Sequence, residues 1–227
     1  MRLLPCNLGA AAALVLTVAI SAGAQEISSS SSQPNEQQGV DPNEHQGVDR
    51  VKFVTGAAVA FLEHEGDHVL FDVIFDAHPY LKSIRFGAIP FFAVAHDLLS
   101  PRREFIVSSA GFWTQEATSE WLLSRRPDFR HEHAPFETGA FAFDILTSVG
   151  YAAVAMVRAG PVERDTRSMA VAIGVDERVI GALVLTPALL DAYRYFSPET
   201  RWAAWTSRLV KLGSAALVLK QTSSPRQ

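Results

Sequence analysis

The chain has 227 residues, which suits one domain or a small two-part protein. Its formal net charge is −4, from 20 Lys and Arg against 24 Asp and Glu, and this balance lacks the basic excess of a nucleic-acid-binding protein. Hydrophobic residues make up 48%, too many for a disordered chain. The single cysteine, Cys6, excludes a disulfide framework and a cysteine-based zinc cluster.

The first 24 residues have the pattern of a secretory signal peptide. Arg2 gives a basic start, residues 8–20 form an uncharged apolar run, and Ala22-Gly23-Ala24 has the small-x-small form of a cleavage site. The alternative is an uncleaved membrane anchor, but the apolar run is short for a membrane span.

Residues 25–50 are predicted to be a disordered linker. They contain five consecutive serines, residues 28–32, and a tandem octapeptide repeat, residues 34–41 and 42–49. This composition offers too few apolar side chains to bury a core. We therefore expect a folded domain over residues 51–220 and a short tail over residues 221–227.

The folded domain is predicted to be mainly α, with a short β segment after its first helix. Residues 51–77 have the length of one long helix, and residues 84–95 are rich in Phe, Ile and Val and suit strands. Ser100-Pro101 begins the next predicted helix, which runs to about Leu123. Further helices are expected over residues 138–157, 179–196 and 197–220, with a charged loop at 125–135 and another loop at 160–167.

Hydropathy leaves both a membrane bundle and a soluble bundle open. No uncharged run reaches the ~18 residues of a clear membrane span, and residues 138–157, whose one charge is Asp144, come nearest. Runs of this kind also form buried core helices. Ionisable residues are nevertheless allowed in a span where they face a functional cavity.

His64-Glu65-Gly66-Asp67-His68 is an HExxH sequence. On a helix, two histidines four residues apart lie on one face and can reach one zinc ion. Glu65 would stand beside them as the base that takes a proton from an attacking water. The apolar residues 57–62 lead directly into the motif, which indicates a helix entering an interior where unpaired His and Glu would be costly.

A catalytic zinc needs a third protein ligand, and we expect it from another segment. Asp72 lies ~12 Å from His64 along a helix, too far for both to bind one ion, and is better read as a supporting carboxylate. Asp144 and Asp191 each lie in an otherwise apolar helix, so both remain candidates. The charged loop around His131 and His133 is a weaker alternative, because a solvated loop explains it equally well.

The chain resembles the site-2-protease-type intramembrane zinc metallopeptidases in three pieces, in order. These are the apolar helix that ends in His64–His68, the segment Leu81–Pro90 followed by Ser100–Gly111, and Thr186-Pro-Ala-Leu-Leu-Asp-Ala192. The last piece is similar to the family's proline-containing segment, whose aspartate binds zinc. The resemblance therefore implies a multi-helix, membrane-embedded bundle in which His64, His68 and Asp191 bind zinc and Glu65 is the catalytic base. Asp144 remains the alternative ligand.

These residues predict a zinc-dependent intramembrane endopeptidase of the cell envelope. Its partners would be the lipid bilayer and a membrane-bound protein or peptide substrate. No nucleic-acid partner is expected. The alternative is a non-catalytic helical envelope membrane protein of the same fold, in which the histidines form a polar cluster without chemistry. A secreted or periplasmic soluble zinc peptidase is a third possibility.

Overall fold

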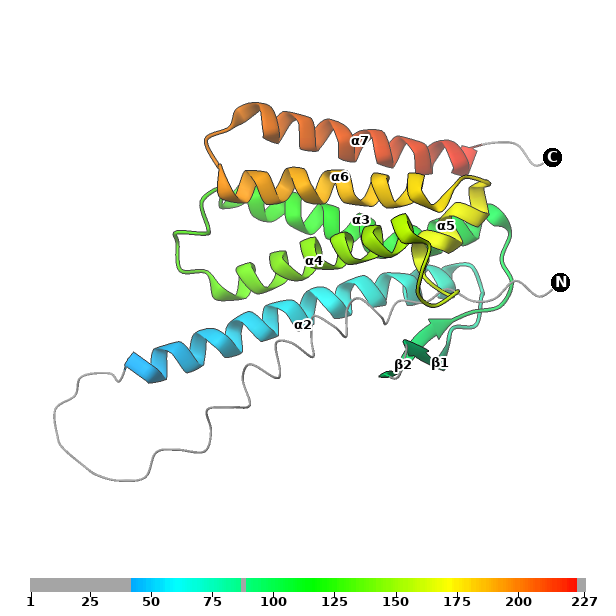
Figure 1. Ribbon diagram of the computed structural model, residues 1–227, viewed down its shortest axis with the longest axis horizontal. Helices are drawn as coiled ribbons and strands as arrows, with labels where there is room; N and C mark the ends of the chain where they lie inside the picture. The colour runs from blue at the N-terminus through cyan, green and yellow to red at the C-terminus, as the bar shows by residue number, and fades with distance from the viewer. Residues whose placement is uncertain (1–41, 87–88, 224–227) are drawn as a thin grey trace, which may run out of the picture.

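The computed structural model describes residues 42–86 and 89–223 (Figure 1). Five long helices run side by side with alternating direction: α2 (Pro42–Ile74), α3 (Pro101–Arg125), α4 (Pro135–Val157), α6 (Glu177–Phe196) and α7 (Arg201–Ser223). The short helix α5 (Asp165–Ile173) and the strands β1 (Tyr80–Phe86) and β2 (Ile89–Ala95) lie at one end of this bundle. The prediction of a mainly helical fold with a short sheet after the first helix is confirmed.

The first described helix begins earlier than expected. α2 starts at Pro42, inside the segment that we expected to be a disordered linker, and continues without interruption to Ile74. Proline suits the first helical position because its missing N–H has no intrahelical partner there. The second copy of the octapeptide is therefore helical. The predicted signal peptide, residues 1–24, and residues 25–41 lie outside the described residues.

The segment after α2 is an antiparallel pair of strands. Tyr80 pairs with Ala95 and Phe86 with Ile89, so β1 and β2 are in register along their whole length. The chain then enters α3 at Pro101, after Ser100 in extended conformation, as the Ser-Pro pattern predicted. α7 likewise begins after a Ser-Pro pair but only at Arg201, and it extends past Lys220 to Ser223.

The tightest contact in the bundle joins α2 to α4. A Cβ atom added at Gly56 would lie 2.0 Å from the carbonyl oxygen of Phe136, and one added at Gly139 would lie 1.9 Å from that of Phe53. Each glycine therefore admits the backbone of the other helix. Around this crossing Ala57, Ala60, Ala140 and Phe143 form a buried cluster that fixes one face of α2 against α4.

A second buried cluster holds α3, α4, α5 and α6 together. It contains Phe105, Phe112, Tyr151, Met169, Ala170, Ile180 and Val184. A proline inside a helix often ends or kinks it. α6 nevertheless stays helical through Pro187. The cluster packs the short helix α5 against α3, α4 and α6.

Two helices, α4 and α6, are long and apolar enough to cross a membrane. About half of the apolar window of α4 is buried inside the bundle, so the core helix of a soluble protein would pass the same test.

Candidate metal centre

The two histidines of the HExxH sequence point into the bundle from α2. They lie one helical turn apart on one face, both are buried, and their ring centroids are 5.2 Å apart. This face of α2 is buried because it also carries Ala57 and Ala60, the small residues that pack on α4. The prediction that His64 and His68 share one face of a helix is confirmed.

Asp165 completes a group of three metal-ligand residues. It is the first residue of α5 and fully buried, and one ligand atom each from His64, His68 and Asp165 lies within 4.8 Å of the others. The Nε2 atom of His68 is 3.9 Å from Oδ2 of Asp165. One metal ion could reach all three after small side-chain movements, so the group could bind a metal.

A buried ion pair fixes the backbone on both sides of Asp165. Arg164 donates from Nε and Nη2 to the two carboxylate oxygens of Glu177, each at 2.5 Å. Thr166 donates to the same carboxylate at 2.9 Å. Because Glu177 begins α6, this bidentate pair joins the starts of α5 and α6 and holds Asp165 at the site.

The ring of His68 is oriented for metal binding. Its Nδ1 lies 2.6 Å from the carbonyl oxygen of Val107 on α3, and a carbonyl only accepts, so Nδ1 carries the proton. The lone pair is then on Nε2, which faces Asp165 and has no hydrogen-bond partner among the described residues. A histidine whose second nitrogen donates to a backbone carbonyl is typical of metal ligands.

The ring of His64 lies between aromatic side chains. Phe112 contacts it edge-on with centroids 5.4 Å apart, and Tyr151 stacks with it at 6.3 Å. Gly111 of α3 passes so close that a Cβ atom there would lie 2.6 Å from three carbons of the ring. Neither nitrogen of His64 makes a well-formed hydrogen bond among the described residues, although the side chain of Gln115 and the backbone of Gly111 lie close to the ring. A ligand at this ring would satisfy a polar group whose burial is otherwise costly.

Glu65 stands beside this group. Its Oε1 atom is buried without a hydrogen-bond partner among the described residues, and its carboxylate is near enough to Asp165 for the two charges to repel. A positive ion between the imidazoles and Asp165 would relieve this repulsion. Glu65 therefore lies beside the candidate ligands, on the same helix as His64 and His68.

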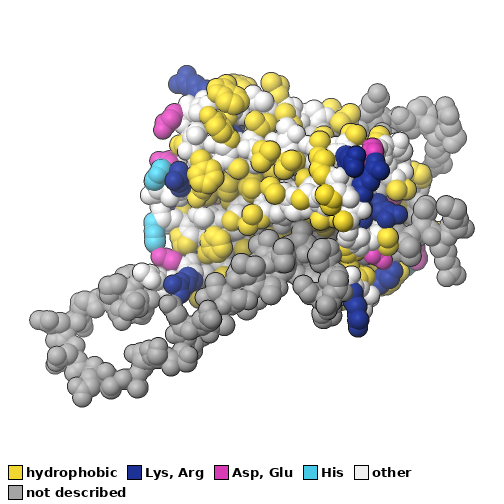
Figure 2. Space-filling view, viewed as in Figure 1, with side chains coloured by type: hydrophobic (Ala, Val, Ile, Leu, Met, Phe, Trp, Pro, Cys, Tyr) yellow, Lys and Arg dark blue, Asp and Glu magenta, His cyan; other side chains and the backbone are white. Residues whose placement is uncertain are grey.

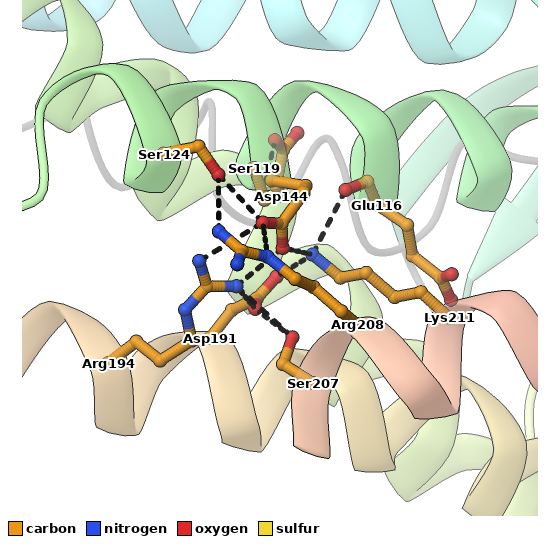
Figure 3. Close-up of polar contacts among 10 residues, drawn as sticks. Glu116, Ser119, Ser124, Asp144, Asp191, Arg194, Ser207, Arg208 and Lys211 are labelled. Carbon is orange, nitrogen blue, oxygen red and sulfur yellow. Dashed lines mark hydrogen bonds and ion pairs between the residues drawn. The ribbon is translucent and has the colours of Figure 1, made fainter. Parts of the chain in front are cut away.

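Asp191, which the resemblance implied as third ligand, lies in a different cluster (Figure 3). Its Oδ1 accepts from Ser207 at 2.6 Å and from Arg194 at 3.1 Å, and its Oδ2 is 2.5 Å from Nζ of Lys211. These partners come from α6 and α7, and they occupy both oxygens. The structure thus joins His64 and His68 to Asp165 and does not place Asp191 with them.

The other sequence candidates are also engaged elsewhere. Asp144 is buried and accepts from Ser119 at 3.0 Å, on the side of α4 near the Asp191 cluster (Figure 3). His131 and His133 are exposed and pair with Asp128 and Asp49. Neither histidine belongs to a three-ligand group among the described residues.

The sequence did not indicate Asp165 as a ligand, because residues 160–167 are predicted to be a loop, whereas Asp165 begins α5 in the structure. The signal available was the short apolar pattern that follows it, with Met169 and Ala170 on one helical face. A short amphipathic helix of this kind must pack on the bundle, and its first residue is carried inward with it. Which helix Asp165 then meets depends on tertiary packing and on the Arg164–Glu177 pair, which no local pattern shows.

Comparison of the chain with models of known protein families, with curated proteins and with solved structures gives no match. What the protein does must therefore be inferred from the geometry of its site.

Proposed function

We propose that the protein is a zinc-dependent peptidase whose site lies inside a membrane-embedded helical bundle. The observation that carries this proposal is the buried group of His64, His68 and Asp165, with Glu65 next to it. Two imidazoles and one carboxylate are the protein ligands of many catalytic zinc sites, which keep a fourth position for water or substrate. We replace Asp191 by Asp165 as the third ligand in this proposal.

Zinc bound there would lower the pKa of a water molecule and polarise a peptide carbonyl. The residues of the chain would move the protons and hold the ligands in place. Glu65 would take the proton from the attacking water and deliver it to the leaving amine nitrogen. His68 would be kept in the correct tautomer by the carbonyl of Val107. The surrounding Phe112 and Tyr151 would keep bulk water away from His64.

The outer surface of the bundle supports a position in the membrane. Large apolar side chains are exposed on every long helix, among them Leu62, Trp121, Leu146, Leu189 and Leu209. On the face shown in Figure 2, hydrophobic side chains cover the middle and charged ones gather at the two ends. α4 has 23 residues, a length of ~34 Å, which matches a hydrocarbon core of ~30 Å.

A substrate segment would fit beside α2. An open cavity of about 860 Å³ lies along α2 and α3. Phe71, Trp113 and Trp121 give it apolar walls, while Glu63 and Thr118 supply polar groups. His64, His68 and Asp165 are buried and do not line this cavity, so a hydrophobic peptide bound in it would have to enter between α2 and α3 to reach the metal centre. The substrate proposed is therefore an apolar, membrane-bound polypeptide.

The test is hydrolysis by the full chain purified in detergent. Labelled casein, an unfolded general substrate, is incubated with protein loaded with zinc. We expect wild type to cleave it, Glu65→Gln to keep its zinc and lose cleavage, and His131→Ala, in the exposed loop, to match wild type. Zinc binding with no cleavage by wild type, of casein or of an apolar transmembrane peptide, would favour the non-catalytic envelope protein instead.

A further inference from the structure

Two hydrogen bonds join α2 to α3 beside the cavity of about 860 Å³. The hydroxyl of Thr118 donates to Oε1 of Glu63 at 3.1 Å, and the hydroxyl of Thr114 donates to Oδ2 of Asp67. On each helix the two residues lie one turn apart, so the two hydrogen bonds follow one another along the seam between α2 and α3. Glu63, Thr114 and Thr118 also line the cavity. We call these two hydrogen bonds the latch.

The two histidines of the metal centre lie on the inner side of the latch. Each follows a latch carboxylate by one residue, which turns it by ~100° around the axis of α2. His64 and His68 are buried by this turn and do not line the cavity. On α3, Gly111 precedes the latch residue Thr114 by three residues and lies against the ring of His64. The latch therefore stands between the cavity and the two imidazoles.

Apolar packing fixes α2 to α4 rather than to α3. Gly56 and Gly139 let the backbones of α2 and α4 approach closely, and a buried hydrophobic cluster surrounds this crossing. Within residues 42–86 and 89–223, no buried hydrophobic cluster contains residues of both α2 and α3. The latch and the hydrogen bond from His68 to the carbonyl of Val107 join these two helices instead. A contact without an apolar cluster opens locally at a smaller cost than a packed core, so this seam is the side of α2 that can part.

The chemistry of the latch lets it hold the seam and also release it. A hydrogen bond to an ionised carboxylate is stronger than one between neutral groups, and apolar surroundings strengthen it further. Phe71, Trp113 and Trp121 supply such surroundings in the cavity. A carboxylate accepts several hydrogen bonds, so a donor of an incoming chain can replace each threonine hydroxyl.

We infer that the latch closes the route from the cavity to the metal centre and opens to admit a chain from the cavity. What passes along this route, an apolar polypeptide, rests on the proposed peptidase function. The closure itself rests on the contacts between α2 and α3, and it can be measured without zinc or cleavage. Valine has the shape of threonine without its hydroxyl, so Thr114→Val combined with Thr118→Val removes both donors of the latch.

The test measures how fast N-ethylmaleimide reaches a thiol on the inner side of the latch, in the full chain in detergent, by mass spectrometry. Cys6 is replaced by Ser, so that an introduced cysteine is the only thiol. Gln115→Cys places this thiol at a residue that is 4% exposed and lies beside the ring of His64. Ala60→Cys is the matched control, because Ala60 is 2% exposed and lies in the cluster between α2 and α4.

We expect the valine pair to speed the labelling of Gln115→Cys by ~10-fold, the factor for losing one hydrogen bond to a charged group, and to leave Ala60→Cys unchanged. Thr114→Ser combined with Thr118→Ser keeps both hydroxyls and should label like the chain with both threonines. Equal labelling of Gln115→Cys with and without the latch would overturn the inference, and so would equal acceleration at both cysteines. Labelling as expected without peptide cleavage by wild type would contradict the peptidase proposal and leave the latch standing.

Discussion

Gly111→Ala should damage the metal centre without touching a ligand. The added Cβ would lie 2.6 Å from Cγ, Cδ2 and Cε1 of His64, whereas carbon atoms in contact are normally ~3.5–4.0 Å apart. The imidazole must therefore move by ~1 Å, and Phe112 and Tyr151 block part of that movement. Overpacking of this kind costs ~1–3 kcal/mol of unfolding free energy.

The displaced ring should also weaken metal binding. Ligand distances in a metal site tolerate only ~0.2 Å of error, and disturbing the support of a ligand typically costs ~10–100-fold in affinity. Zinc affinity can be measured by competition with a chromophoric chelator. Gly66→Ala is the matched control, since nothing lies within 4 Å of its Cβ, and it should bind zinc like wild type. A folded Gly111→Ala protein with wild-type affinity would refute this description of His64.

Three further predictions concern the bundle. Asp191→Ala should lower the unfolding free energy by ~3–5 kcal/mol in denaturation experiments, because it leaves the buried Arg194 and Lys211 partly unpaired. Gly139→Ala should lower the melting temperature strongly, since its Cβ would meet the backbone of α2. The amide of Arg178 and the guanidinium of Arg158 lower the pKa of the exposed Asp176. The ionised Asp176 should therefore stabilise the folded state fully above the ordinary aspartate pKa of ~4, and this stabilisation should be lost as the pH falls through the lowered pKa of the folded state. Urea unfolding of Asp176→Asn should lack this acid dependence.

The helical framework could be predicted from the sequence because its signals are local. Ser100-Pro101 marked the start of α3, and the Phe- and Val-rich stretch before it marked the strands. The start of α2 could not be predicted in this way. The second octapeptide copy is polar enough for a linker, yet a helix that is anchored further along by Gly56 and Ala57 can extend through it.

The two histidines of the candidate site could also be predicted from local sequence. The spacing of His64 and His68 sets their common face, whatever the rest of the chain does. Asp191, the predicted third ligand, is a buried carboxylate in an otherwise apolar helix, but helix periodicity does not say which side chains it meets. The structure supplies them from α6 and α7, as Lys211 and Ser207. Asp165 reaches the histidines through the packing of a short helix, which only the three-dimensional arrangement reveals.

The most direct measurement compares the zinc content of Asp165→Asn and Asp191→Asn with that of wild type, after dialysis against a weak chelator. Both substitutions preserve side-chain volume, so packing changes little. If Asp165 binds the ion with His64 and His68, as the geometry indicates, Asp165→Asn should lose one zinc ion per chain and Asp191→Asn should lose none. Full zinc content in Asp165→Asn, or loss of the ion in Asp191→Asn, would contradict the assignment of the metal centre.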